Sequence, residues 1–176
     1  MKKFAISILL IAAIAVIAFA FGGGESGGAE SAYLRVHIRA NSNAEADQRV
    51  KYEVRDAVVT FLTPTVAECE TKAEAMECIR GKLGEIAAVA ESVLSARGFS
   101  YGARASLREE DFPTRVYDEV TLPAGVYDAL ILELGTGEGD NWWCVVYPPL
   151  CFTAGNGNIV YKSKIKEIIQ SFFGNS

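Results

Sequence analysis

The chain is poor in the side chains that most enzymes and metal proteins use for their chemistry. Among its 176 residues there are one histidine and four cysteines, and no two cysteines stand in a Cys-x-x-Cys spacing. A zinc site built from closely spaced cysteines and histidines is therefore not expected. We predict neither a metal nor any other cofactor.

Catalytic motifs are also missing. The glycine-rich segment 135–141 lacks the lysine and serine or threonine that end a phosphate-binding loop, and a strand pattern follows it. We therefore predict a hairpin loop there. The one thiol and imidazole set would join Cys144 or Cys151 to His37, but a disulfide that closes a turn is the stronger interpretation of those cysteines. No catalytic residue is predicted, and the chain is not expected to be an enzyme.

Positive charge is in short supply. Lysine and arginine number 17 against 22 aspartates and glutamates, a net charge of −5. Without residues 1–20, which hold two lysines, the net charge is −7. Such a chain is not expected to bind nucleic acid or an anionic lipid surface.

An uncharged run from Phe4 to Phe21 follows two lysines at the N-terminus, which is the layout of an export signal. Ala18 and Ala20 have the spacing that suits signal peptidase, yet the run of 18 residues is also just long enough to span a bilayer. Residues 1–20 are therefore predicted to be a signal peptide or a membrane anchor. Either alternative places the rest of the chain outside the cytoplasm.

Three segments follow this leader. Residues 21–32 are glycine-rich and are predicted to form a flexible tether. Residues 33–152 have the length and patterning of one domain. Residues 153–176 are predicted to be a linker and an amphipathic C-terminal helix, which could dock on the domain or lie on a membrane.

Hydrophobic periodicity predicts an α+β fold for the domain. Helices are expected over 44–62, ending at Pro64, and over 71–97. In the first strand Arg35, His37 and Arg39 alternate with apolar residues and should lie on its polar face. Short connections imply that the later strands are antiparallel neighbours. We expect two helices on one face of a mostly antiparallel sheet of about five strands, at 33–39, 99–108, 115–122, 126–134 and 142–147.

The four cysteines are expected to form disulfides, because an exported chain meets an oxidising environment. Cys144 and Cys151 flank two prolines where the chain could reverse. Cys69 and Cys78 are nine residues apart at the start of the second predicted helix. We favour these two local pairs among the three possible connectivities.

The segment 141–152 concentrates aromatic residues, cysteines and prolines. On a strand, Trp142 and Trp143 point to opposite faces, so one can lie in the core while the other is partly exposed. An exposed tryptophan beside a disulfide would give a rigid surface for partner recognition. The alternative is that both tryptophans are buried beneath the helices.

Three stretches of the sequence resemble the stage II sporulation protein R family of endospore-forming Firmicutes. They are residues 34–42 with Asp47, Gln48 and 51–56, residues 122–127 with Ala129 and Leu130, and residues 141–152. Arg39 and Asn43 depart from the pattern, where the family leads us to expect a smaller apolar residue and an aspartate.

The resemblance implies a signalling role. Members are made in the forespore, exported into the space between the two membranes, and trigger a membrane-embedded aspartic protease in the mother cell. That protease then removes the pro-sequence of the mother-cell sigma factor E. The resemblance thus implies a protein partner on the extracytoplasmic face of the membrane.

A protein can activate a protease only by binding its active state more tightly than its inactive state. We hypothesise that His37, Arg39 and Asn41, together with Trp142 or Trp143, make that contact. Two alternatives come from other classes of protein, namely a secreted cell-wall or peptide hydrolase and an anchored extracytoplasmic binding module.

Overall fold

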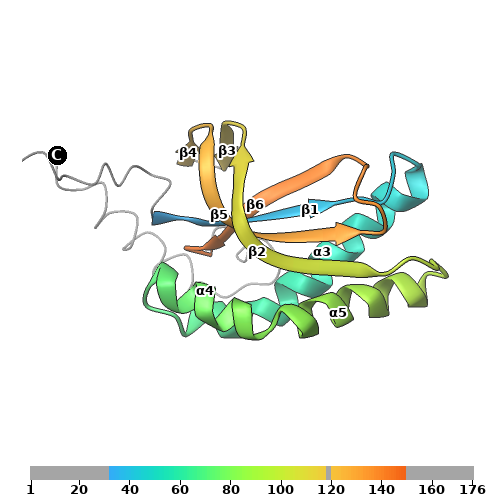
Figure 1. The fold of residues 1–176 in the computed structure, drawn as a ribbon, viewed down its shortest axis with the longest axis horizontal. Helices are drawn as coiled ribbons and strands as arrows, with labels where there is room; N and C mark the ends of the chain where they lie inside the picture. The colour runs from blue at the N-terminus through green and yellow to red at the C-terminus, as the bar shows by residue number, and fades with distance from the viewer. Residues whose placement is uncertain (1–31, 118–119, 150–176) are drawn as a thin grey trace, which may run out of the picture.

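The computed structural model describes residues 32–117 and 120–149 (Figure 1). The leader, nearly all of the tether, Cys151 and the predicted C-terminal helix lie outside these ranges. Within them, no helix has both the length and the apolar character needed to cross a membrane.

The described chain folds as an α+β domain, as predicted, with three helices on one side of a mostly antiparallel sheet (Figure 1). Its elements in chain order are β1 (Leu34–Arg39), α3 (Glu45–Ala67), α4 (Lys72–Gly81), α5 (Leu83–Ala96), β2 (Ala103–Phe112), β3 (Arg115–Tyr117), β4 (Val120–Leu122), β5 (Gly125–Leu134) and β6 (Asn141–Tyr147).

The main sheet has the strand order β2-β5-β1-β6. β1 runs parallel to β5 and antiparallel to β6, and β2 is antiparallel to β5. The prediction that β5 and β6 are joined as a hairpin is therefore wrong, because β1 lies between them. The glycine-rich loop between β5 and β6 crosses the end of β1, where hydrogen bonds to residues just after that strand hold it in place.

The strand predicted over 115–122 is two strands. β3 and β4 pair with each other as a separate antiparallel hairpin, so this segment doubles back on itself. The hairpin stands on the side of the main sheet that faces away from the helices (Figure 1). The described residues thus hold six strands in two sheets instead of about five in one.

The helices also differ from the prediction. α3 does not end at Pro64 but continues to Ala67. Proline inside a helix costs about 3 kcal/mol, whereas burial of Leu62 and Val66 on either side of it contributes about 1.5–3 kcal/mol each. The helix predicted over 71–97 is two helices, which meet at Lys82 between Gly81 and Gly84, residues of low helix propensity.

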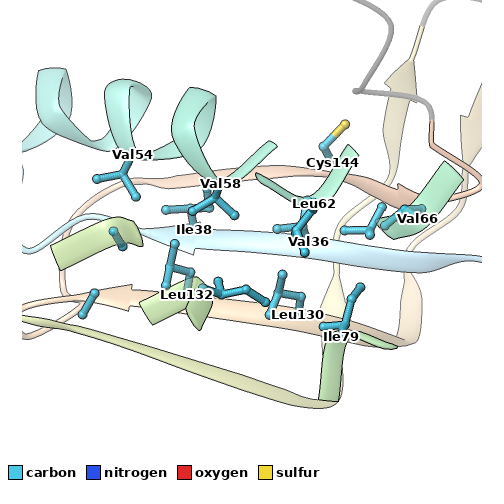
Figure 2. Close-up of a cluster of buried hydrophobic side chains, with 14 of the residues drawn as sticks. Val36, Ile38, Val54, Val58, Leu62, Val66, Ile79, Leu130, Leu132 and Cys144 are labelled. Atoms are coloured by element: carbon cyan, nitrogen blue, oxygen red, sulfur yellow. The ribbon is translucent and has the colours of Figure 1, made fainter. Parts of the chain in front are cut away.

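A first apolar core fills the space between the helices and the sheet. Val54, Val58 and Leu62 of α3 lie over the apolar residues of β1 and β5 (Figure 2). Cys144 of β6 and Ile79 of α4 belong to the same cluster. This core fixes β1 in the middle of the sheet and directs its alternate residues away from the helices.

Those alternate residues of β1 are not on a solvated face, contrary to the prediction. Arg35 and His37 are almost completely buried, and Arg39 is half-buried. A second cluster of aromatic and aliphatic side chains from β2, the β3–β4 hairpin, β5 and β6 covers them. Strand periodicity identifies the two faces of a strand but not what packs on the second one.

Candidate interaction surface

The sheet face that points away from the helices, here called the outer face, is built around Arg35. Its guanidinium lies 4.0 Å from the ring centroid of Phe112 and 4.8 Å from that of Tyr127. Nη2 donates a 2.8 Å hydrogen bond to the hydroxyl of Tyr117 in β3. Arg35 therefore ties the β3–β4 hairpin to the main sheet through cation–π contacts and one hydrogen bond.

His37 lies one position further along the outer face. Its ring stacks on Trp143 with centroids 5.4 Å apart, and its Nδ1 is 3.1 Å from Glu110 Oε1. Burial lowers the pKa of His37, although Asn141 and Glu110 act to raise it. The imidazole is therefore predominantly neutral at pH 7 and supports Trp143 from beneath.

Two carboxylates organise the end of the outer face. Glu110 pairs with Arg39, and Glu133 lies 3.3 Å from Arg39. Arg108 lies 3.3 Å from Glu110 and 3.5 Å from Glu133, and Arg104 lies 3.8 Å from Glu133. Burial alone would raise the pKa of Glu110, but the charge and hydrogen bond of Arg39, together with His37 and Arg108, outweigh burial and hold the pKa below its usual value.

Trp143 is connected to this group through His37, which stacks on its ring and contacts Glu110, and Trp143 also contacts a fourth arginine. The guanidinium of Arg115 lies 4.2 Å from the Trp143 ring centroid, and both residues are half-buried. We call the whole group the outer-face cluster; its members are Arg39, Arg104, Arg108, Arg115, Glu110, Glu133 and Trp143.

Asn41 and Trp142 lie outside the outer-face cluster. The Asn41 side chain is used internally, since Nδ2 donates to Asp47 and Oδ1 accepts from the backbone amide of Thr136. Trp142 packs on the helix side, with the guanidinium of Arg55 5.6 Å from its ring centroid. Of the five predicted contact residues, the structure brings only His37, Arg39 and Trp143 together.

Asn41 belongs instead to a buried polar cluster between β1 and α3, here called the corner network. Asp47 accepts hydrogen bonds from Asn41, Ser42 and Tyr101, at 2.8, 2.6 and 2.7 Å. Burial alone would raise the pKa of Asp47, but these hydrogen bonds lower it. Lys51 completes the network with bonds to Gln48 and to the backbone carbonyl of Asp140.

Two glycines of the β5–β6 loop are explained by the corner network. Gly135 has φ +57°, and a Cβ there would lie 2.1 Å from Asn41 Oδ1. A Cβ at Gly139 would lie 2.3 Å from the carbonyl oxygen of Ser42. These glycines allow the loop to pack closely against the corner, which is a structural use of glycine.

The cysteines occupy two places. Cys144 is disulfide-bonded, and its partner lies outside the described residues. Cys69 and Cys78 are both thiols in the structure and are close enough to form a hydrogen bond. Burial and Cys78 raise the pKa of Cys69 to about 11. Their oxidised form stays a prediction.

The described residues give His37 no thiol to activate. Cys144 pairs in register with Val36 and faces the helices, whereas His37 pairs with Trp143 and faces the other way. Within residues 32–117 and 120–149, no group of three histidine, cysteine or acidic side chains is arranged to hold a metal ion.

Sequence reasoning missed Arg104, Arg108 and Arg115 as members of the surface. The alternation of arginine with small and apolar residues over 103–108 placed two of them on one face of a strand. Nothing in the sequence indicated that this face meets Trp143, because β2 and β6 are the opposite edges of the sheet.

Fold and surface together define the class: a small α+β domain with a charged aromatic sheet face and a polar corner that closes one end. The sequence model of the family described as stage II sporulation protein R matches residues 30–156. Stage II sporulation protein R of Bacillus subtilis (strain 168) is 39% identical over 135 residues. The chain belongs to the stage II sporulation protein R family.

The match to the Bacillus protein covers 76% of this chain and 60% of the relative. The chain thus spans less than two thirds of that curated protein. No solved structure matches the chain.

Proposed function

We propose that the chain is an exported sporulation signal that activates a membrane-embedded aspartic protease, which in turn processes the pro-form of the mother-cell sigma factor E. The observation that carries the proposal is family membership, established over residues 30–156. The export signal predicted for residues 1–20 supports a route from the forespore into the space between the two membranes.

The outer-face cluster is the surface that we propose for contact with the protease. It combines a half-buried tryptophan with arginines, the residue types that contribute most to binding energy at protein interfaces. The buried His37 stacks on Trp143 and so holds the tryptophan in one orientation before binding. A rigid surface loses little conformational entropy on association.

Activation then follows from differential binding. If the outer-face cluster fits only the active conformation or assembly of the protease, binding shifts the population towards that state. For an exported chain, the leader decides how the signal reaches its target. A cleaved leader would release the domain, whereas a retained leader would leave it on the glycine-rich tether.

The experiment is co-expression in cells that do not sporulate. The full chain, the protease and the pro-form of the sigma factor are produced together, and processing is measured by immunoblot. We expect the mature sigma factor only when all three are present. A chain without residues 1–20 stays in the cytoplasm and should give no processing; processing without the chain, or equal processing without its leader, contradicts the proposal.

A further inference from the structure

We propose that the outer-face cluster recognises an acidic segment on the extracytoplasmic side of its partner protein. This inference rests on the proposed function, because that function supplies the partner, and it adds the chemistry of the contact. Its basis is a local excess of arginine on a chain whose net charge is −5.

The ion pairs of the outer-face cluster show the excess of arginine over glutamate. The outer-face cluster holds four arginines and two glutamates, and three of the arginines share those two carboxylates. Three guanidinium groups carry about 15 N–H donors, whereas two carboxylates offer about 8 acceptor positions. Many of these donors therefore have no acceptor within the cluster and are left for water or for a partner.

The arginines that share Glu133 differ in exposure. The side chain of Arg104 is 73% exposed and that of Arg108 is 43% exposed, while Arg39 is 29% exposed. Arg39 is thus mainly a bridge between the two carboxylates. Arg104 and Arg108 are four residues apart on β2 and therefore point to the same face of the sheet. They are the donors that a partner can reach.

A carboxylate is the group that this arrangement fits. Guanidinium binds carboxylate through two parallel hydrogen bonds, and such charge-assisted bonds are about twice as strong as neutral ones. The half-buried Glu110 and Glu133 hold the arginine side chains in place, so part of their conformational entropy is already lost before a partner binds. Trp143 with Arg115 offers an apolar and cation–π contact on the same face of the sheet, at the edge opposite to Arg104 and Arg108.

A protein segment suits the surface better than an anionic membrane does. Anionic lipid attracts clusters of basic residues in proportion to their number. Here two glutamates lie among the arginines, and the chain as a whole is negative and would be repelled. Specific pairing with a few carboxylates is favoured over adsorption to a charged plane.

The test uses the co-expression assay with graded induction of the full chain. The variant Arg104→Gln with Arg108→Gln removes two outer-face charges. The matched control, Arg49→Gln with Arg80→Gln, removes two exposed charges from the helix side and leaves the same net charge. We expect the first variant to raise the chain level needed for half-maximal processing about tenfold or more, and the control to change it less than about twofold.

A charge exchange identifies the partner group. Arg104→Glu with Arg108→Glu should abolish processing, and lysine in place of the acidic residues of one extracytoplasmic segment of the protease should restore it. Equal levels of exported variant and wild-type chain, checked by immunoblot, show that folding and export are intact.

The outcomes separate the two proposals. If the wild-type chain gives no processing, the proposed function fails. If it does, but both glutamine variants behave alike, the acidic partner is refuted while the function stands. The acidic partner is also refuted if the exported Arg104→Gln, Arg108→Gln chain no longer binds phosphatidylglycerol vesicles but supports normal processing. That result would assign the two arginines to a membrane.

Discussion

Asp47 gives the sharpest prediction about the fold, because one carboxylate holds together three elements. It is 6% exposed and accepts hydrogen bonds from Asn41 and Ser42 after β1 and from Tyr101 before β2. Asp47→Ala leaves these three donors without their acceptor. A hydrogen bond to a charged group contributes about 1.5–3 kcal/mol, and the three are not additive, so we expect a loss of about 3–5 kcal/mol.

That loss is large against the total stability of a domain, about 5–15 kcal/mol. The assay is urea unfolding of the exported chain, followed by tryptophan fluorescence. The matched control is Asp56→Ala on α3, whose side chain is 67% exposed and pairs with the neighbouring Arg55; its cost should be about 0–1 kcal/mol. If the free energy of unfolding of Asp47→Ala lies within about 0.5 kcal/mol of that of the control, the corner network does not stabilise the fold as argued.

The pH dependence of Asp47 has a definite sign. Its folded-state pKa is lowered, so its contribution to stability is fully present above the unfolded pKa of about 3.9. The contribution is lost as the pH falls through the lower folded-state value. Asp47→Asn should flatten this part of the stability profile.

Two further predictions concern His37 and the free cysteines. Burial lowers the folded-state pKa of His37, so its contribution to stability is complete above about pH 6.5 and is lost as the pH falls through the lower folded-state value. Unfolding free energies measured between pH 8 and pH 5 should therefore decline in the wild-type chain and decline less in His37→Gln; parallel profiles would refute a buried neutral imidazole. Cys69 and Cys78, which are in hydrogen-bonding contact, should form a disulfide on export. The exported chain should then take up no alkylating reagent until it is reduced, and labelling of both cysteines without reduction would contradict the pairing.

The fold class and most strand positions could be predicted because they depend on local patterns. Alternation of polar and apolar residues located β1 and the first part of β2, and the glycine- and proline-containing turns around them located β5 and β6. Thr71 is the N-cap of α4, as its spacing indicates. The strand order could not be predicted, since insertion of β1 between β5 and β6 depends on contacts distant in sequence. The prediction that the first helix ends at Pro64 was wrong for the same reason, because tertiary burial of Val66 outweighs the local cost of proline.

The candidate site was predicted in part. The alternation in β1 correctly put His37 and Arg39 on one face, and the resemblance singled out the tryptophans. Which tryptophan joins that face depends on strand register: His37 pairs with Trp143, and this pairing leaves Trp142 on the helix side. Asn41 is expected from the sequence to contact the partner, because a polar side chain after a strand gives no sign of the corner network to which it belongs.

The most direct test of the central claim replaces each tryptophan in turn within the co-expression assay. Trp143→Ala removes the aromatic member of the outer-face cluster, whereas Trp142→Ala removes its neighbour on the helix side. With export and folding of both variants verified, we predict that Trp143→Ala abolishes sigma-factor processing and that Trp142→Ala retains it. Normal processing by a well-folded, exported Trp143→Ala chain would contradict the account.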